Sequence, residues 1–490
     1  MHDPISAGTT VLSAGGQCFT VDADLAQKFQ AGDRLVADDR AGLLHIAAAE
    51  QRVSISAVDA CTAAFEAMDG ISDAQIVDFF GRFAHALSDD AIWGAIVAVN
   101  NGDVAAARER GRSTTRLAVS ETMRKNMIEG LKGWADTPSK RDHVMETIQH
   151  DGFRIELVGA ALGVVAFVFE GRPNVLADAC GVLRGGNTVI FRIGSDALAT
   201  AREIMQRAVK PALLAAGLPG NAIVLVDSPA HAAGWSLFLD PRLSLAVARG
   251  SGPAVDLLGA LAQSAGTPVS LHGTGGAWLI ASEQTDADAF KSAVQRSLDR
   301  KVCNTLNTCC IPRSAAAQLV PLLLEALGAA AKTRHTHFKL HVVETDADCV
   351  PASLYDHEVD IVRAEGVERE RQAQTLRHDD LGHEWEWEES PEISLVLVEH
   401  LDQAIDLFNQ FSPRLVATLL SRDPQEHTRF WQRIRSPFVG DGHTRWVDGQ
   451  FALGKPELGL SNWANGRLFG RGAILTGDSV YTVRTRYVSD

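Results

Sequence analysis

The sequence predicts an α/β protein with two parallel β-sheets, because short, continuously apolar segments alternate with longer stretches of helical periodicity. This alternation occurs in two separate series along the chain. The chain has 490 residues, which is too many for a single hydrophobic core, so two or three domains are expected. We therefore assign one α/β domain to each series.

The first series starts at Gly163. Strands that are buried on both faces of a parallel sheet read as unbroken apolar runs rather than as alternating patterns. By this criterion strands are expected at residues 164–169, 187–191, 222–226 and 245–248, with helices at residues 175–183, 196–216 and 253–262.

The second series runs from Trp278 to Leu420. Its apolar segments are residues 278–280, 309–311, 395–398 and 415–420, and its helices are expected at residues 288–298, 319–331 and 403–411. Between residues 333 and 390 the chain is rich in His and then acidic, and it closes with a Glu- and Trp-rich stretch at residues 384–389. We interpret this stretch as a solvated edge.

Smaller elements flank the two series. A few short strands are expected within residues 1–52, two amphipathic helices between residues 54 and 87, and another helix at residues 120–134. The run from Asn100 to Asp103 is expected to cap a further helix. Residues 143–157 predict a hairpin that turns at Asp151-Gly152, and residues 479–488 predict a lone strand that needs a sheet to join.

Composition excludes several classes of protein. The net charge of −15 argues against nucleic acid or an anionic membrane surface as the main partner. Residues 1–10 have no secretory signal, and the apolar segment at residues 155–169 is too short and interrupted to span a bilayer. Seven cysteines without regular spacing predict a reduced, cytoplasmic protein, and no metal-ligand pattern is present.

Two turns that follow apolar strands are typical of nucleotide binding. Gly250-Ser251-Gly252 lets the backbone approach a phosphate at a helix N-terminus, although an ordinary strand-to-helix turn explains this incomplete motif equally well. Arg192-Ile193-Gly194-Ser195 offers a guanidinium to phosphate and no carboxylate to a ribose hydroxyl, which favours NADP over NAD. Asp196 weakens that preference, and the alternative for Arg192 is a surface charge at a strand end.

Cys303 is the candidate nucleophile. It follows a predicted helix, has polar neighbours and lies two residues from Lys301, whereas Cys309 and Cys310 lie in an apolar stretch and are expected in the core. The segment that ends at Asn174 also follows an apolar strand, so its amide is a candidate donor to an oxyanion. Alternatively, Pro173-Asn174 begins the next helix, and both interpretations are compatible.

These stretches, in this order and spacing, resemble the glutamate-5-semialdehyde dehydrogenases (gamma-glutamyl phosphate reductases) of the aldehyde dehydrogenase superfamily. The resemblance covers roughly residues 53–488. Three motifs carry most of it, Arg172-Pro173-Asn174, Val302-Cys303-Asn304 and Thr444-Arg445-Trp446, together with the turns at residues 192–195 and 249–252 and the segment at residues 457–461.

The resemblance implies an aldehyde-dehydrogenase-like fold. In this fold residues 53–142 and 159–275 form an NADP-binding domain, residues 276–460 a catalytic domain, and residues 143–158 and 478–488 an oligomerisation sheet. Residues 1–52 are then an N-terminal extension of unknown role. The resemblance also implies a homo-oligomer, a dimer or tetramer, with small-molecule substrates.

The resemblance assigns roles to individual residues. Cys303 is implied as the nucleophile, and Asn174 and the Cys303 backbone N–H as the oxyanion hole. The implied NADP site contains Arg192, Gly194, Ser195, Gly250, Ser251 and Gly252, and the implied substrate site contains Arg172, Asn304, Thr444, Arg445 and Ser461. An arginine such as Arg445 is suited to bind a carboxylate bidentately.

The implied reaction is NADPH-dependent reduction of gamma-glutamyl phosphate, or a close analogue, to a semialdehyde through a Cys303 thioester, as in proline biosynthesis. Hydrolytic aldehyde dehydrogenases carry a glutamate base in the segment that matches residues 271–275. Here no carboxylate occurs between Pro268 and Ile280, which favours acyl reduction over oxidation to a free acid. We interpret His272 as a loop histidine; the alternative is that it acts as a base.

The chain departs from the family pattern at three places: Gly171, the segment that follows Cys303 and begins at Thr305, and Asp441-Gly442-His443 beside the expected pocket. These departures indicate a diverged enzyme. Two alternatives therefore stay open: a reductase for another acyl phosphate or acyl thioester, and a non-catalytic member that binds nucleotide or partners.

Overall fold

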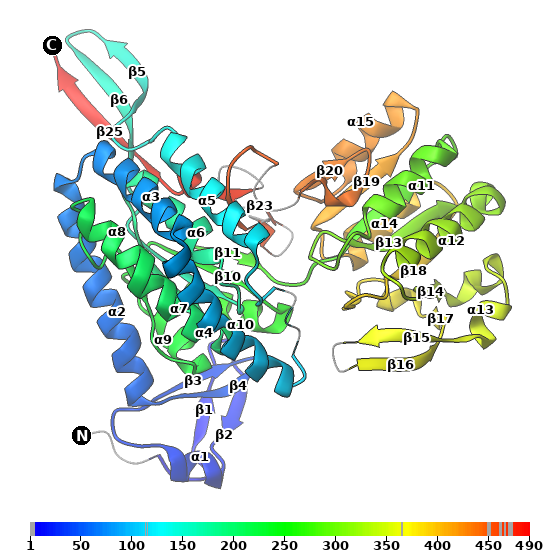
Figure 1. Ribbon diagram of the computed structural model, residues 1–490, viewed down its shortest axis with the longest axis horizontal. Helices are drawn as coiled ribbons and strands as arrows, with labels where there is room; N and C mark the ends of the chain where they lie inside the picture. The colour runs from blue at the N-terminus through cyan, green and yellow to red at the C-terminus, as the bar shows by residue number, and fades with distance from the viewer. Residues whose placement is uncertain are drawn as a thin grey trace.

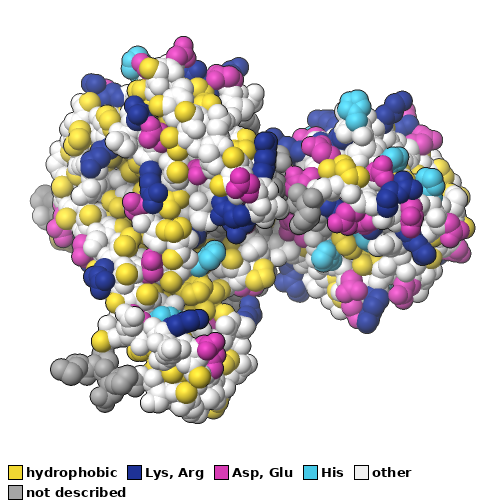
Figure 2. Space-filling view, turned by 60° about the horizontal axis from the view of Figure 1, so that its bottom comes forward, with side chains coloured by type: hydrophobic (Ala, Val, Ile, Leu, Met, Phe, Trp, Pro, Cys, Tyr) yellow, Lys and Arg dark blue, Asp and Glu magenta, His cyan; other side chains and the backbone are white. Residues whose placement is uncertain are grey.

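The computed structural model describes residues 5–112, 114, 116–363, 366–447, 452–459, 463–464, 467–468 and 474–490. Figure 1 shows two parallel sheets in separate lobes, as the sequence predicts, and a small third sheet that carries the C-terminus. In the space-filling view, basic and acidic side chains are interspersed over both lobes (Figure 2).

A five-stranded parallel sheet organises the first lobe, and every strand predicted in the first series forms. Its order is β11-β10-β7-β8-β9, and β11 was not predicted as a strand. The strands are β7 (Val164–Phe169), β8 (Thr188–Ile193), β9 (Ile223–Leu225), β10 (Leu245–Arg249) and β11 (Val269–His272). All neighbours are parallel, so the carboxyl ends of these strands share one edge.

Helices cover both faces of this sheet because successive side chains of each strand point to opposite faces. Val165 and Phe167 on β7 pack in a different apolar cluster from Val164 and Ala166. The first face is covered by α3 (Asp73–Ser88), α4 (Asp90–Glu109), α5 (Glu121–Asp136), α6 (Val175–Ala179), α7 (Leu198–Ile204) and α8 (Lys210–Ala215). The second face is covered by α2 (Ala48–Ala67), α9 (His231–Phe238) and α10 (Gly252–Ser264).

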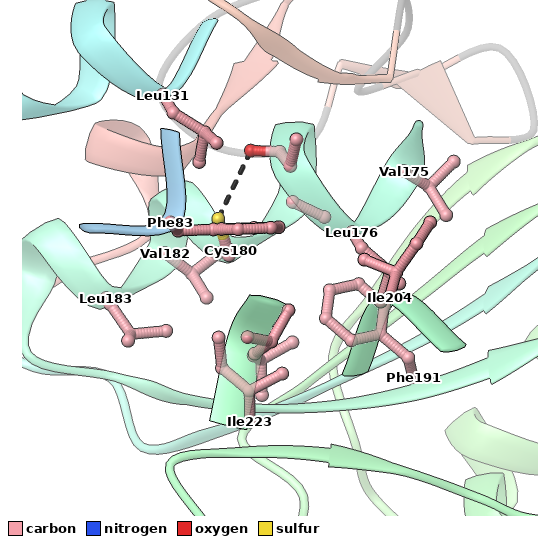
Figure 3. Packing of buried hydrophobic residues seen from close by; sticks show 14 of the residues in the cluster. Phe83, Leu131, Val175, Leu176, Cys180, Val182, Leu183, Phe191, Ile204 and Ile223 are labelled. Atoms are coloured by element: carbon pink, nitrogen blue, oxygen red, sulfur yellow. Dashed lines mark hydrogen bonds between the residues drawn. The ribbon is translucent and has the colours of Figure 1, made fainter. Parts of the chain in front are cut away.

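Figure 3 shows part of the first core, where Phe83 of α3 and Leu131 of α5 lie close to Cys180. The Cys180 thiol donates to the Ala177 carbonyl at 3.2 Å, and burial raises the pKa of this thiol well above its usual value. Cys180 is fully buried among the apolar side chains of this cluster, so it is a core residue.

The second lobe is built on a seven-stranded parallel sheet with the order β17-β14-β18-β13-β12-β19-β20. Its strands are β12 (Ala277–Ala281), β13 (Leu306–Pro312), β14 (Lys339–Val343), β17 (Ala373–Leu376), β18 (Glu392–Val398), β19 (Val416–Leu420) and β20 (Phe438–Gly440). One face packs on α11 (Ala287–Arg296) and α12 (Ala316–Thr333), and the other on α14 (Leu401–Phe411) and α15 (Pro424–Arg433). The antiparallel hairpin of β15 (Glu358–Arg363) and β16 (Gly366–Arg371), preceded by α13 (Ser353–Asp356), precedes β17.

The segment Arg313–Thr333 is long and apolar enough, by length and composition alone, to cross a membrane. Its Leu319, Leu323 and Leu327 side chains are buried in the cluster that covers the seven-stranded sheet. It is therefore a core helix.

A three-stranded antiparallel sheet joins distant parts of the chain and confirms two predictions. β5 (Val144–His150) and β6 (Phe153–Ala160) form the predicted hairpin, with Gly152 at a φ of 81° in its turn. The C-terminal strand β25 (Thr482–Ser489) pairs with β6 along its whole length. The lone strand thus joins a sheet within its own chain.

The N-terminal segment forms β1 (Thr10–Leu12), β2 (Cys18–Thr20), α1 (Ala23–Lys28), β3 (Arg34–Asp38) and β4 (Gly42–Ile46), as two antiparallel pairs. Leu44 and Ile46 pack against Leu239 and Leu261 of the first lobe. Near the other end of the chain, β21 (Glu457–Gly459) pairs with β24 (Leu475–Thr476), and β22 (Trp463–Ala464) with β23 (Arg467–Leu468).

One predicted helix start is wrong. Helix α4 runs without a break through Asn100–Asp103 and is capped by Asp89, whose carboxylate accepts from the backbone N–H groups of Ala91 and Ile92. The buried Asn100 amide instead donates to the Leu117 carbonyl at 3.0 Å. Asn and Asp favour caps because they bond to backbone, and here Asn100 bonds to the backbone of a different segment.

Candidate active site

Cys303 lies in a tight turn between α11 and β13, at an edge of the seven-stranded sheet. The Thr305 backbone N–H donates to the Val302 carbonyl at 3.0 Å, and the Thr305 hydroxyl donates to the Arg300 carbonyl at 2.6 Å. The Gly276 N–H donates to the Cys303 carbonyl at 2.7 Å. These bonds fix the backbone on both sides of the thiol.

Gly275 packs directly against this turn. A Cβ at position 275 would lie 2.5 Å from the Cys303 Cα and 2.7 Å from a carboxylate oxygen of Glu384. Both distances are too short for carbon, so the position requires glycine. Gly275 belongs to the segment that connects β11 of the first sheet to β12 of the second, and the turn that carries Cys303 (residues 300–305, the candidate nucleophile turn) therefore packs against the crossing between the lobes.

Opposing effects act on the Cys303 thiol. Burial is the largest and raises its pKa, while the positive charges of Arg116 and Arg172 lower it. Glu384 raises the pKa and Lys301 lowers it. The net result is a raised pKa, so the thiol is protonated at neutral pH, and the neighbouring cations are the groups that favour its thiolate form. Cys309 and Cys310 are fully buried in the core, as predicted.

Two of the nearby arginines are held in surroundings that disfavour charge. Burial lowers the pKa of Arg172 to about 10 and that of Arg249 to about 9. The Arg249 Nη1 donates to the Ala248 and Ser270 carbonyls at 2.9 and 3.2 Å. Its Nε and Nη2 are buried and have no hydrogen-bond partner among the described residues.

His272 faces Arg249 in the parallel register of β10 and β11. Burial, together with the charges of Arg249 and Arg172, lowers its pKa well below the usual value, so the imidazole is neutral. Its Nε2 is buried without a partner in the part of the chain described here. The histidine is therefore not an exposed loop residue.

The acidic stretch at residues 384–389 is a solvated edge only in part, because Glu386 and Glu389 are exposed whereas Glu384 and Trp387 are not. Glu384 accepts a hydrogen bond from the Lys301 Nζ at 2.5 Å, with only 8% of the Lys301 side chain and 14% of the Glu384 side chain exposed. Its other carboxylate oxygen accepts from the Gly275 N–H. Trp387 is buried in the core beside the seven-stranded sheet. The stretch thus supplies a side chain to the wall of the nucleophile turn.

Asn307 fastens this stretch to β13. Its amide Nδ2 donates to the His383 carbonyl at 2.8 Å, and its Oδ1 accepts from the Trp385 N–H at 2.9 Å. Trp385 in turn stacks on His341, with 3.5 Å between ring centroids. One sequence signal could have found this contact: Trp385 and Trp387 alternate with carboxylates, a period typical of an extended segment with one buried face.

Asn174 is the N-cap residue of α6, so the structure confirms that a helix begins there. Its Nδ2 donates to Asp178 Oδ2 at 2.8 Å, one helical turn further on. This contact holds the amide in place. Its role as an oxyanion donor stays a prediction.

Asn304, Thr444 and Arg445 form a buried cluster next to Cys303, which Asn304 follows in the chain. The Thr444 hydroxyl donates to the Asn304 carbonyl at 2.8 Å, and the Arg445 Nη1 donates to the Asn304 side-chain oxygen. The Arg445 Nε donates to Asp299 Oδ1 at 2.6 Å and its Nη2 to Oδ2 at 3.4 Å. The fork expected to grip a substrate carboxylate therefore holds Asp299. Ser461 lies outside the described residues.

The predicted cofactor turns meet at the carboxyl edge of the five-stranded sheet. Ser251 is the N-cap of α10, and its side chain makes no cap hydrogen bond. A Cβ on Gly252 would lie 2.3 Å from the Thr274 hydroxyl, and one on Gly194 would lie 2.9 Å from the Gly171 nitrogen. Glycines at these positions let three loops approach closely and leave helix N-terminal N–H groups for a pyrophosphate, so the residues fit a dinucleotide.

Arg192 is buried rather than a surface charge at a strand end. Its Nη2 donates to the Pro229 carbonyl at 3.0 Å, and its Nε has no partner among the described residues. Ser195 begins the short helical turn that follows, and Asp196 in that turn pairs with Arg110 at 2.9 Å and with Arg112 at 2.8 Å. Asp196, a carboxylate beside the predicted ribose site, is thus paired with two arginines, and a second carboxylate, Glu50, acts on the Arg192 charge.

A sequence model of the aldehyde dehydrogenase family matches residues 37–338, and the chain belongs to this family. Two curated relatives are gamma-glutamyl phosphate reductases. The protein from Afipia carboxidovorans is 30% identical over 77% of this chain and 82% of its own length. The protein from Brucella anthropi is 29% identical over 78% of this chain and 83% of its own length.

The fold is shared with the crystal structure of gamma-glutamyl phosphate reductase from Thermotoga maritima. The TM-score is 0.75 at 20% identity, and the match covers 89% of this chain and 98% of that chain. Membership of the aldehyde dehydrogenase family implies an oxidoreductase with a NAD(P) cofactor. The closely packed glycine turns at residues 194 and 250–252 fit such a cofactor.

Proposed function

We propose that the protein reduces an activated acyl group, gamma-glutamyl phosphate or a close analogue, to a semialdehyde through a thioester on Cys303. The observation that carries this proposal is the charge around the thiol. Burial raises the pKa of Cys303, and the charges of Arg116, Arg172 and Lys301 oppose that rise. Arg249 lies on the neighbouring strand end, beside His272. Such a pocket attracts an acyl group with an anionic leaving group.

The Glu384 carboxylate is not free to activate water. No carboxylate occurs between residues 268 and 280, where a hydrolytic base would be expected. Glu384 reaches the same region, but one of its oxygens accepts from Lys301 and the other from the Gly275 N–H. Both oxygens of Glu384 are thus occupied by donors. This arrangement supports reduction of the thioester rather than its hydrolysis.

The protein's part in the reaction follows from these positions. The Cys303 thiolate attacks the acyl carbon, a C–S bond forms, and the phosphate departs with the electrons of the broken C–O bond. A nicotinamide cofactor held by the turns at residues 192–195 and 250–252 would supply the hydride that reduces the thioester. Collapse of the resulting hemithioacetal releases the aldehyde and regenerates the thiolate, and donors such as Asn174 and the Cys303 N–H stabilise the oxyanion in both steps.

NADPH is the proposed cofactor. A carboxylate near the adenosine ribose selects NAD by accepting from the 2′-hydroxyl and by repelling a 2′-phosphate. Asp196 is paired with both Arg110 and Arg112, and buried Arg192 lies on the strand that precedes it. The net charge of this group is positive, which favours the phosphorylated cofactor.

The β5–β6–β25 sheet is the proposed oligomerisation element of a cytoplasmic enzyme with a small-molecule substrate. It exposes apolar side chains from its two outer strands, which suits burial against a second copy. These residues are Val144, Met145, Ile148, Val483 and Tyr487. All seven cysteines are unpaired, as a reduced compartment requires.

The reverse reaction tests the proposal. The purified enzyme is supplied with NADP⁺, inorganic phosphate and a panel of semialdehydes, and NADPH formation is followed by absorbance. Phosphate-dependent turnover of glutamate 5-semialdehyde is expected. Turnover only of another aldehyde, or only with a thiol such as coenzyme A in place of phosphate, would favour the alternative of a different acyl phosphate or thioester. No turnover with any combination of semialdehyde and phosphate or coenzyme A would favour a non-catalytic member of the family.

A further inference from the structure

Arg249 presents an unused pair of donors. Its Nη1 is held by two backbone carbonyls, whereas Nε and Nη2 are both buried and without a partner among the described residues. These two nitrogens form one edge of the guanidinium plane, the edge that grips two oxygens of a carboxylate or phosphate in parallel. Leaving buried donors unpaired is costly, so this edge is built for a ligand.

Arg172 adds a second buried cation to the same place. Arg172 and Arg249 lie close enough for the charge of each to matter to the environment of Cys303, and the positive charge of Arg172 disfavours the charged form of Arg249. No ion pair joins either guanidinium to a carboxylate in the part of the chain that the structure describes. Glu170 and Asp178 offset part of the Arg172 charge, but neither guanidinium has an ion-pair partner there, and such a pair of cations is stabilised most by a doubly charged anion.

The backbone places this pair beside the nucleophile. Arg249 ends β10 next to Phe169, which ends β7, and the Glu170 N–H donates to the Arg249 carbonyl at 3.2 Å. His272 ends β11 beside Arg249, and three residues later Gly275 packs on Cys303. The neutral His272 imidazole, with a buried and unpartnered Nε2, contributes one more hydrogen-bonding group on the same side.

We propose that Arg249, Arg172 and His272 form a phosphate subsite that receives the leaving group of the acyl phosphate as Cys303 attacks. The inference rests on the proposed function, since it assigns the phosphoryl end of that substrate. In the reverse direction the same subsite delivers inorganic phosphate: a phosphate oxygen attacks the thioester carbon, the C–S bond breaks, and the electron pair returns to the Cys303 sulfur.

Protection of Cys303 against alkylation tests the subsite without requiring turnover. The whole enzyme is treated with iodoacetamide at increasing inorganic phosphate, and alkylation is read by mass spectrometry of the peptide that contains Cys303, because exposed Cys18 reacts independently. The protection factor is formed within each variant, so a change in the basal alkylation rate cancels. Sodium glutarate and NADP⁺ are run in parallel as a carboxylate and as a pyrophosphate.

Phosphate is expected to protect the wild-type enzyme, and Arg249→Gln is expected to raise the half-protecting phosphate concentration by about tenfold or more, since a bidentate charged contact is lost. Arg249→Lys keeps the positive charge but loses the two parallel N–H donors, so its half-protecting phosphate concentration should lie between those of the wild type and Arg249→Gln. Arg82→Gln, a surface arginine on α3 that pairs with Asp78, is the matched control and should leave the curve unchanged. Thermal melting of each variant checks that it is folded.

Equal protection of wild type and Arg249→Gln by phosphate would overturn the proposal, and so would protection by glutarate or NADP⁺ alone. The first outcome would mean that the fork does not hold the anion, and the second would assign it to a carboxylate or to the cofactor. Failure of the proposed function has a different signature. Phosphate then still protects Cys303 through Arg249, but no semialdehyde is turned over with phosphate.

Discussion

The Lys301 ammonium lies 2.5 Å from the Glu384 carboxylate, although 83 residues separate the two in the chain. Lys301 precedes the nucleophile by two residues, and Glu384 also accepts from the N–H of Gly275, which packs on the Cys303 backbone. One carboxylate therefore joins the nucleophile turn to the segment that connects the two sheets. The negative charge of Glu384 also offsets the positive charge of Lys301, so the effect of Lys301 on the Cys303 thiol is weakened.

This pair predicts a pH effect with opposite signs in two variants. Glu384 favours the protonated thiol, so Glu384→Gln should lower the pKa of Cys303 and shift the pH profile of Cys303 alkylation to lower pH. Glu386 lies 3.7 Å from Lys301 and keeps a negative partner near the ammonium in that variant. Lys301→Met removes the cation and should shift the profile to higher pH.

The measurement is the alkylation rate of the Cys303 peptide between mildly acidic and strongly alkaline pH. Because reaction requires the thiolate, the midpoint of the rise reports the thiol pKa. Shifts of both variants in the same direction would show that the substitutions act by loosening the turn rather than through charge.

Gly275→Ala should disrupt the nucleophile turn. The added Cβ would meet backbone, the Cys303 Cα at 2.5 Å, which cannot rotate away as a flexible side chain can. We expect a loss of about 2 kcal/mol or more in the free energy of unfolding and a large loss of activity. Urea unfolding and steady-state kinetics check the two effects.

Gly328→Ala in α12 is the matched control. A Cβ there would have no heavy atom within 4 Å, and alanine is the better helix former by roughly 0.5–1 kcal/mol. Neutral or slightly raised stability with unchanged kinetics is expected. If Gly275→Ala behaved like this control, the close contact at Cys303 would not constrain the turn.

Cofactor preference should depend on Arg112. This residue pairs with Asp196 at 2.8 Å, and its removal leaves a carboxylate with one cationic partner fewer beside the proposed ribose 2′-phosphate. Arg112→Ala should reduce kcat/KM for NADPH relative to NADH by about tenfold, because charged hydrogen bonds to phosphate are worth roughly 1.5–3 kcal/mol. Kinetics with both cofactors give the ratio, and an unchanged ratio would remove Arg112 from the cofactor site.

The parallel sheets could be predicted because buried strands have a local signature. The runs that became β7, β8, β10 and β18 are continuously apolar, and a continuous run has few other interpretations in a soluble chain. Strand β14 was missed because Lys339 and His341 interrupt its apolar pattern. Both are buried and pair with acids, Lys339 with Glu370 and His341 with Glu392.

The chemistry around Cys303 was only partly predictable for a related reason. Cys303 and Asn174 lie in motifs that can be recognised locally, whereas Glu384 reaches the turn through a long-range contact. A local reading of the Glu-rich stretch predicts exposure, and only the pairing with Lys301 and the burial of Trp387 reverse it in part. Motif spacing likewise cannot predict that the Nε and Nη2 of Arg249 have no partner among the described residues, or that the guanidinium of Arg445 binds Asp299, because both depend on tertiary contacts.

The most direct test of the proposed reaction is to trap the acyl group on Cys303. The enzyme is mixed with glutamate 5-semialdehyde and NADP⁺ without phosphate, quenched in acid, and examined by peptide mass spectrometry. We expect a glutamyl adduct on Cys303 that disappears when inorganic phosphate is added before the quench, and neither adduct nor turnover in Cys303→Ala. Phosphate-dependent NADPH formation by Cys303→Ala, or an adduct on another residue, would contradict it.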